Sequence, residues 1–284
     1  MDYASSWHLR SLDPWVPAGC RAVGVRRLRA TMRRTLLMVL LARGAAWSPA
    51  AAVGGRGRVA QMSASSQKDL VIWDCDGCLV DSEALLKTAE VEALAVAGFT
   101  DVTIDDCNRL FSGYAPEAGA ARFLEEYGEP LPEHFFRDQI EGSIALFRER
   151  LTQLNAKTVL ALHAAGRKQV VASGSPLDRV LVCLEVAGID HCFSGIYTRE
   201  DVPGRGKPLP DMFLLAADKM GVAPSDCVVV EDSTSGVRAA QAAQMEVVGY
   251  LGGGHAQAEW YRKNIAEFDI PLTYSDTELL GYLL

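Results

Sequence analysis

Short apolar runs that stop at polar or glycine residues recur along this chain after residue 68. The first is Leu70 to Trp73, and later ones lie at 169–172, 227–230 and 246–251. Runs this short, bounded by turn residues, are typical of strands buried on both faces of a parallel sheet. Helical patterns separate or follow them, at 81–94, 178–186, 211–220 and 234–243. Repeated strand–helix units predict an α/β fold, a doubly wound parallel sheet with a Rossmann-like core. A further strand is predicted at 192–196.

A long stretch after the first strand has no strand-like run. Between about residues 87 and 150 the pattern is helical, at 90–97, 116–127 and 133–151, with breaks at glycines and prolines. Such a stretch predicts a small α-helical domain inserted into the sheet domain. We expect the helical domain at 87–151 and the sheet domain at 68–86 and 152–284.

The first 67 residues differ in composition from the rest. Between Pro14 and Gln67 there is no Asp or Glu, while nine arginines occur. The apolar run 35–42 is too short to span a bilayer, which takes about 20 residues. It is similar to the central part of a signal peptide starting at Met32, and the basic, Ser/Ala-rich remainder resembles a transit peptide. We therefore expect 1–67 to be a disordered targeting leader for a plastid or another imported compartment. The alternative is a true start at Met32 or Met62 and a cytoplasmic protein.

The charge of the chain limits its partners. Asp and Glu number 36 against 28 Lys and Arg, for a net charge of −8. Because nucleic-acid binding needs a basic surface, nucleic acid is not expected as the partner. The seven irregularly spaced cysteines do not predict a disulfide scaffold. No membrane contact is expected in the mature form, and a monomer is the default expectation.

Polar residues cluster directly after several of the predicted strands. Asp74 and Asp76 follow the first, Ser173 the second, and Glu231 and Asp232 the third. In an open α/β sheet the ligand crevice lies at the carboxyl ends of the strands. These side chains are therefore expected to converge although they are far apart in the sequence. Lys207 lies in a predicted loop and can join them.

The paired aspartates indicate phosphoryl chemistry with a metal ion. Side-chain alternation turns Asp74 and Asp76 the same way, and two adjacent carboxylates call for a cation or a shared proton. Mg²⁺ prefers oxygen ligands of this kind, and Asp232 and Glu231 can supply more. One carboxylate can then attack phosphorus while the other handles the leaving-group proton. Lys207 can offset negative charge, and Ser173 with nearby backbone N–H groups can hold the phosphate.

Four segments together resemble the motifs of the haloacid dehalogenase (HAD)-like hydrolase superfamily. In the family's order they are Asp74 to Glu83, Val170 to Ser173, Lys207-Pro208-x-Pro210-Asp211, and Val228 to Gly236. The resemblance covers about residues 68–284 and is nearest to subfamily IA members of the β-phosphoglucomutase and phosphatase kind. It implies a HAD-like α/β core, with the helical insert as a C1-type cap that closes over the site.

The resemblance also implies roles for individual residues. Asp74 would be the phosphorylated nucleophile and Asp76 the general acid/base, with its backbone carbonyl on Mg²⁺. The carboxylates of Asp74 and Asp232 would complete the metal ligands, with Glu231 acting nearby through water. Ser173 and Lys207 would hold the phosphate. Substrate contacts are expected from the motif II turn and the cap loop, at Gly174, Ser175, Gly113 and Tyr114.

The leading hypothesis is a phosphatase acting on a small phosphorylated metabolite of the sugar phosphate, 6-phosphogluconate or phosphoglycolate type. A β-phosphoglucomutase-type isomerase with the same nucleophile is the first alternative. The absence of an Arg just after Gly113 counts against it, because nothing there would grip a second phosphate. A catalytically silent metabolite-binding protein is the second alternative.

Two further features are left open by the sequence. Cys75 and Cys78 have the spacing of a redox pair, although alternation turns Cys75 into the core. Cys78 also stands where relatives usually carry Thr, and Trp73 where they carry Phe. The glycine run 252–254 with His255 follows a late strand and either borders the site or is a plain loop.

Overall fold

The computed structural model describes residues 68–112, 114 and 116–284. The expected leader at 1–67 and Gly113 of the expected cap loop lie outside the described residues. None of the described helices is long and apolar enough to cross a lipid bilayer.

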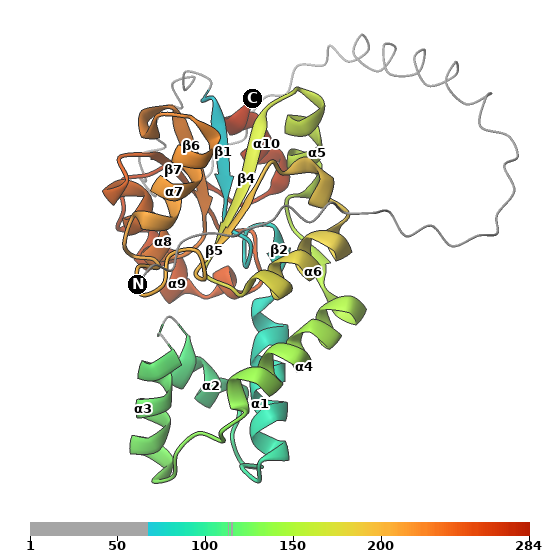
Figure 1. Cartoon of the computed structure of the whole chain (residues 1–284), viewed down its shortest axis with the longest axis vertical. Coiled ribbons are helices and arrows are strands. Elements are labelled where there is room, and N and C mark those ends of the chain that lie inside the picture. The colour runs from blue at the N-terminus through green and yellow to red at the C-terminus, as the bar shows by residue number, and fades with distance from the viewer. Residues whose placement is uncertain (1–67, 113, 115) are drawn as a thin grey trace, which may run out of the picture. The chain divides into compact units, whose positions relative to one another are not determined.

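The described chain contains one six-stranded parallel sheet, which confirms the predicted fold class (Figure 1). Its strands, in spatial order, are β5 (Ile196–Thr198), β4 (Lys168–Ser173), β1 (Leu70–Trp73), β6 (Cys227–Glu231), β7 (Glu246–Tyr250) and β8 (Leu272–Thr273). The first strand lies in the middle, between β4 and β6, and all three are buried except for Lys168 at the start of β4. The chain therefore winds outward to both sides from the strand that carries the paired aspartates.

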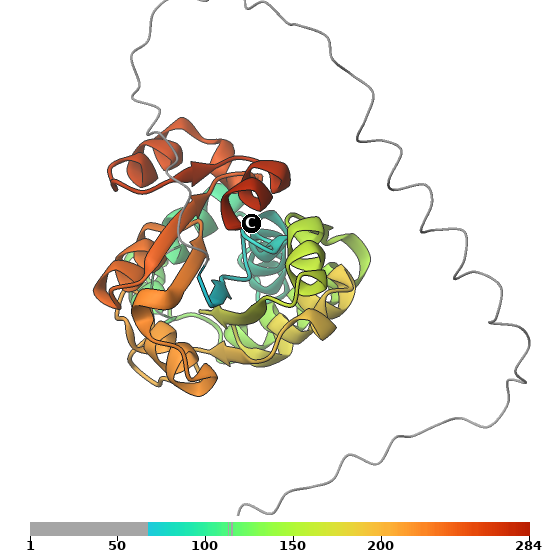
Figure 2. The same ribbon diagram turned by 90° about the horizontal axis from the view of Figure 1, so that it is seen from above.

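Each face of the sheet has its own apolar core, since successive side chains point to opposite sides. Leu70 and Ile72 pack with helices α7 (Asp211–Met220) and α8 (Thr234–Ala242). Val71 and Trp73 face the other core. That core is formed by α5 (Ala156–Ala164), α6 (Leu177–Ala187) and α10 (Asp276–Leu283). In Figure 2, where the molecule of Figure 1 is seen from above, helices lie on both sides of the sheet. The helix α9 (Glu259–Ala266) follows β7.

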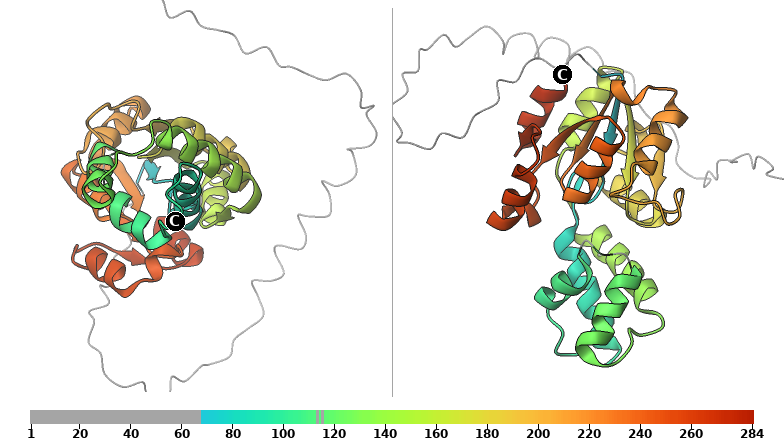
Figure 3. Two further views of the ribbon diagram at one scale, coloured as in Figure 1. Left: turned by 90° about the horizontal axis from the view of Figure 1, so that it is seen from below. Right: turned by 90° about the vertical axis from the view of Figure 1, so that its left-hand side faces the viewer.

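Four helices form a separate group in the chain between β1 and β4. They are α1 (Glu83–Val96), α2 (Ile104–Phe111), α3 (Pro116–Tyr127) and α4 (Phe135–Arg150). An aromatic cluster around Phe123 packs them together, with Phe99 at 5.0 Å and Tyr127 at 4.6 Å between ring centroids. The two segments that lead in and out of this group pair as a short antiparallel ladder, β2 (Val80–Asp81) with β3 (Thr152–Gln153). Figure 3 shows most of this group beyond the ends of the strands. Leu85 and Leu86 of α1 and Phe147 of α4 belong to the same core as Val71 and Trp73.

The sequence patterns missed the helices α2, α5, α9 and α10 and the strand β8, and they misplaced one strand. The helix α2 begins at a capping box, in which the Thr103 side chain and Asp106 bond reciprocally to each other's backbone N–H groups. The prediction of a strand at 192–196 is wrong in its first part. Residues Asp190–Cys192 form a 3₁₀ turn closed by the Cys192 N–H donating to the Ile189 carbonyl (2.9 Å), and β5 begins only at Ile196. Short apolar runs do not distinguish these two cases.

Candidate active site

The site begins where β1 ends. Asp74 follows the last strand residue, its N–H donates to the Val230 carbonyl (3.0 Å), and its side chain is buried. The chain then turns at Gly77, whose φ of +77° is a conformation that favours glycine. A Cβ on Gly77 would stand 2.1 Å from Asp232 Oδ2. Glycine here therefore lets the ends of β1 and β6 bring their carboxylates together.

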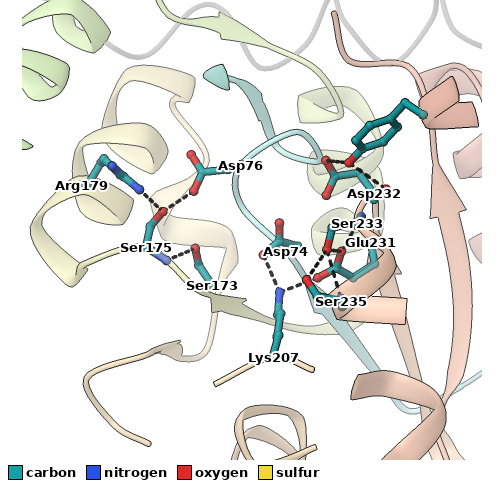
Figure 4. A network of polar contacts seen from close by, with 12 residues as sticks. Asp74, Asp76, Ser173, Ser175, Arg179, Lys207, Glu231, Asp232, Ser233 and Ser235 are labelled. Carbon is teal, nitrogen blue, oxygen red and sulfur yellow. Dashed lines mark hydrogen bonds and ion pairs between the residues drawn. The ribbon is translucent and has the colours of Figure 1, made fainter. Parts of the chain in front are cut away.

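Lys207 joins these strands by charge. Its Nζ lies 2.7 Å from Asp74 Oδ1 and 2.5 Å from Glu231 Oε1, and all three side chains are buried (Figure 4). Burial raises the pKa of Asp74 well above its usual range, Lys207 lowers it, and Glu231, Asp232 and Asp76 raise it further. The two carboxylates outweigh the effect of burial on Lys207, so its pKa lies above the usual range. The network thus holds more negative charge than its single lysine balances.

Glu231 and Asp232 have different surroundings although they are neighbours. Glu231 is fully buried, and its Oε2 accepts from the N–H and the hydroxyl of Ser233, both at 2.9 Å. A Cβ on Gly236 would stand 1.8 Å from Glu231 Oε1, so that glycine makes room for the carboxylate. Asp232 Oδ2 lies 2.6 Å from His255 Nε2 and accepts from Tyr261 Oη at 3.4 Å. The position of Asp232 Oδ2 is therefore fixed by contacts with His255 and Tyr261.

His255 and Tyr261 were not among the residues singled out as site residues. The His255 ring centroid lies 5.0 Å from that of Tyr261. Its Cε1 is 2.7 Å from where a Cβ on Gly77 would be, and 2.8 Å from where one on Gly253 would be. The run of glycines after β7 therefore allows the imidazole to reach Asp232. Of the two predictions for this loop, the geometry favours the one in which it borders the site.

Asp76 is held by two hydroxyl groups. Ser82 Oγ donates to its Oδ1 at 2.6 Å, and Ser175 Oγ donates to its Oδ2. Ser175 Oγ in turn accepts from Arg179 Nη2 at 2.6 Å. Ser173 lies at the end of β4, where its hydroxyl accepts from the Ser175 N–H at 3.1 Å. Figure 4 shows Asp76, Ser173, Ser175 and Arg179 beside the Lys207 network.

The residues expected to contact substrate lie in two places. Ser175 is buried in the network, and Gly174 beside it is exposed, with no atom within 4 Å of where a Cβ would be. Tyr114 is 48 % exposed and lies against Arg122, whose guanidinium carbon is 4.3 Å from the ring centroid. Tyr114 lines a pocket whose wall includes Arg179 but none of the carboxylates that follow β1 and β6.

The two cysteines of the Cys75-x-x-Cys78 spacing face different surroundings. Cys75 is a free cysteine, and a hydrogen bond between its thiol and that of Cys183, together with burial, raises its pKa well above the usual range. Cys78 Sγ lies within 4.8 Å of carboxylate oxygens of Asp74 and Asp232, and burial followed by their charge raises its pKa. Both thiols are therefore held protonated, which does not favour the redox hypothesis.

The donor set fits a hard divalent cation. Carboxylate oxygens of Asp74 and Asp232 lie within 4.8 Å of one another, and both side chains are buried, as is the adjoining Glu231. Buried carboxylates this close need a positive partner beyond Lys207. Oxygen ligands of this kind suit Mg²⁺, and the Asp76 backbone lies on the same turn.

Comparisons with known proteins agree with this arrangement. The family model described as haloacid dehalogenase-like hydrolase matches residues 68–244. Fructose-1-phosphate phosphatase YqaB of Escherichia coli is 29% identical over 63% of this chain and 94% of its own length. SUPPRESSOR OF QUENCHING 1, a chloroplastic protein of Arabidopsis thaliana, is 31% identical over 63% of this chain, but the match spans only 17% of that protein.

A solved structure extends the similarity to the fold. A mutant of CbbY from Rhodobacter sphaeroides, in complex with xylulose-(1,5)bisphosphate, superposes with a TM-score of 0.64 at 26% identity. The alignment covers 75% of this chain and 96% of CbbY. The matched family model spans more than half of the chain and includes β1, β4 and β6 with the polar residues that follow them. The chain belongs to the haloacid dehalogenase-like hydrolase family.

Proposed function

We propose that this protein is a Mg²⁺-dependent phosphatase that transfers the phosphoryl group of a small metabolite to Asp74 and then to water. That it is a phosphoric monoester hydrolase follows from its family and from relatives named as phosphatases. The observation that carries the mechanism is the buried contact of Asp74 Oδ1 with Lys207 Nζ at 2.7 Å, beside Glu231 and Asp232.

In the first half-reaction an Asp74 carboxylate oxygen attacks phosphorus. The bond between phosphorus and the ester oxygen breaks, and Asp76 gives its proton to the departing alcohol. Lys207 offsets the charge on Asp74 and on the phosphoryl oxygens. Ser173 and the N–H groups of the turn that contains Gly174 and Ser175 hold the phosphoryl group, since this turn lies beside Asp76.

In the second half-reaction water attacks the phosphorus of the aspartyl-phosphate. Asp76 takes a proton from this water, the bond to the Asp74 oxygen breaks, and inorganic phosphate leaves. Asp74, the Asp76 carbonyl and Asp232 would hold Mg²⁺, with Glu231 nearby. When bound, the ion neutralises charge that the carboxylates and the phosphoryl oxygens would otherwise direct at one another.

The four-helix group is proposed to be the cap that selects the substrate, with 87–151 as its extent. It contributes Phe111, Tyr114 and Gln139 to the pocket beside Arg179, which supports this assignment. The substrate class proposed is that of sugar phosphates and small acid phosphates. Fructose 1-phosphate is the substrate in the name of one relative, and it belongs to this class. We further propose that residues 1–67 direct the protein to a plastid, and the chloroplastic relative supports this.

Phosphate release from a panel of phosphorylated metabolites, with and without Mg²⁺, tests the proposal. One or a few sugar or acid phosphates are expected to release phosphate in the presence of Mg²⁺ only, and Asp74→Asn protein is expected to be inactive. Turnover by Asp74→Asn equal to that of the unchanged protein would refute the nucleophile. Conversion of β-glucose 1-phosphate to glucose 6-phosphate without phosphate release would identify a mutase instead.

A further inference from the structure

A pocket with two arginines lies beside the carboxylate network. Its volume is about 340 Å³, and its wall combines side chains of α1 to α4 with Pro176, Arg179 and Arg199 of the sheet domain. Much of the remaining wall is apolar, including Leu86, Phe111, Phe136 and Ile140. Arginines in a pocket of this kind fix the orientation of an anionic ligand.

Neither arginine has an acidic partner among the described residues. Arg179 Nη2 donates to the neutral Ser175 hydroxyl at 2.6 Å, and its Nε is buried without a hydrogen-bond partner. The Arg199 guanidinium forms no hydrogen bond or ion pair within the described part of the chain. Arg199 is an exposed residue. Partial burial of its guanidinium and the nearby charge of Arg179 lower the pKa of Arg199, so the two guanidinium groups are close enough to repel each other. Two such guanidinium groups are stabilised by an anion between them.

The acidic residues near the pocket do not neutralise this charge. Glu90 lines the pocket, but its carboxylate is bound by Lys87 Nζ at 3.0 and 3.1 Å. Glu117 and Glu200 act on Arg199 from a distance, are exposed, and form no ion pair with it in the described residues. The positive charges of both guanidinium groups are therefore not neutralised by an ion pair within the described residues, and both groups can bind an anionic ligand.

The position of the pocket relates this ligand to the reaction. Ser175 Oγ bridges Asp76 and Arg179, so the arginine lies one hydroxyl group away from the proposed acid/base. A substrate whose phosphate is at Asp74 and that extends past Asp76 would reach Arg179, and with it the pocket that Arg199 also lines. The volume is at the lower end of the roughly 300 to 1,000 Å³ of small-molecule pockets. This space suits a short carbon skeleton.

We infer that Arg179 and Arg199 bind a second anionic group, a carboxylate or a phosphate, at the end of the substrate opposite the phosphate that is cleaved. The inference rests on the proposed function and narrows its substrate class to acid phosphates and bisphosphates. The absence of an arginine after Gly113 does not remove the means to bind a second anion, because the sheet domain supplies two.

Matched substrate pairs test the inference. 6-Phosphogluconate and glucose 6-phosphate differ at carbon 1, where the first carries a carboxylate. Fructose 1,6-bisphosphate and fructose 1-phosphate differ by one phosphate. In at least one pair, the substrate with the second anionic group is expected to have a kcat/KM at least about tenfold higher than its partner. A difference of this size is expected for a charge-assisted contact. The pair that shows the preference identifies carboxylate or phosphate as the second anion.

Arg199→Gln is the variant to compare, because Arg199 does not contact the carboxylate network. We expect it to reduce the preference about tenfold, toward a ratio of one. Arg137→Gln is the matched control, since Arg137 lies on α4 outside the pocket and pairs with Asp138 at 2.8 Å. It is expected to keep the preference of the unchanged protein. Thermal unfolding of both variants checks that each is folded.

The two proposals fail in different ways. A ratio near one for both pairs in the unchanged protein, or an equal preference in Arg199→Gln, overturns the inference while phosphate release continues. If no substrate releases phosphate, the proposed function fails. Calorimetry with Asp74→Asn protein then compares 6-phosphogluconate with glucose 6-phosphate directly. Equal affinity in that measurement also overturns the second-anion site.

Discussion

Lys207 is a buried ammonium group placed between two buried carboxylates, Asp74 and Glu231. Removing the cation leaves both carboxylates in an apolar setting, and such a loss costs about 3 to 5 kcal/mol in buried pairs. It also raises the pKa of Asp74 further, since Lys207 is the group that lowers it. A residue of this kind therefore acts on stability and on the nucleophile at the same time.

For Lys207→Met we expect a loss of roughly 100-fold or more in kcat/KM, because one preorganised charge is removed from the reacting group. The metal-free protein is expected to lose about 3 to 5 kcal/mol of unfolding free energy. Steady-state kinetics and urea unfolding measure the two effects. Unchanged stability would show that Asp74 and Glu231 do not depend on this lysine.

His255 is expected to affect metal affinity more than folding. Its Nε2 lies 2.6 Å from Asp232 Oδ2, the carboxylate proposed to hold Mg²⁺. Partners of metal ligands typically change metal affinity by about 10- to 100-fold when they are removed. We predict that His255→Ala weakens Mg²⁺ binding, measured by calorimetry, by roughly tenfold or more, and that His255→Asn restores part of it. His191→Ala, an exposed histidine, serves as the control.

At the scale of single elements, helix α8 begins where Glu231 needs space. Ser233 caps the helix by accepting from the Gly236 N–H at 3.0 Å, and Gly236 stands where a Cβ would overlap the Glu231 carboxylate. The start of α8 and the end of β6 are thus built as one unit. A side chain at position 236 displaces the carboxylate that holds Lys207.

Two glycine-to-alanine changes are expected to have opposite signs. Gly236→Ala should destabilise the protein by about 1 to 3 kcal/mol, as overpacking does, and reduce activity. Gly281→Ala lies in helix α10, where a Cβ would meet no atom within 4 Å. It should raise stability by roughly 0.5 to 1 kcal/mol, because alanine favours a helix more than glycine does. Thermal unfolding measures the stability of the two variants, and phosphate release measures their activity. Equal effects of Gly236→Ala and Gly281→Ala on both quantities would contradict the proposed crowding at Glu231.

Helix α1 holds a buried ion pair whose effect on stability depends on pH. Burial raises the pKa of Glu90 although Lys87 lowers it. A raised folded-state pKa means that the stabilising contribution is present below the ordinary pKa of Glu and is lost as the pH rises through the raised value. Glu90→Gln removes this dependence. The stability of the variant relative to the unchanged protein should therefore increase from pH 4 to pH 7, measured by urea unfolding; a constant difference would contradict it.

Across the whole molecule, sequence patterns predicted which carboxylates follow the ends of the strands. Asp74, Asp76 and Asp232 follow strands that are short, buried and easily recognised. The residues that come from elsewhere were missed for a physical reason. His255 reaches the site through a glycine loop, and Arg179 and Arg199 come from a helix and a loop without a local pattern. Only three-dimensional proximity relates these residues to Asp76 and Asp232.

The proposed leader leads to a prediction about where residues 1–67 direct a protein. Residues 1–67, fused to a fluorescent protein, are expected to direct it to plastids, because this segment lacks acidic residues between Pro14 and Gln67 and holds a short apolar run. A chain that starts at Met62 is expected to stay in the cytosol. Microscopy distinguishes the two, and cytosolic fluorescence from both would support the alternative of a true start at Met32 or Met62.

The ladder of β2 with β3 has a consequence for how such proteins diversify. Because Val80–Asp81 pairs with Thr152–Gln153, the chain leaves the sheet domain and returns to it at neighbouring points. A segment whose ends are adjacent can be replaced by one of another length at little cost, because the entropy of closing the loop depends only weakly on its length. Asp74, Lys207 and Asp232 all lie outside it. Descendants of one ancestor can therefore inherit the same chemistry while acquiring new substrates through this one insertion.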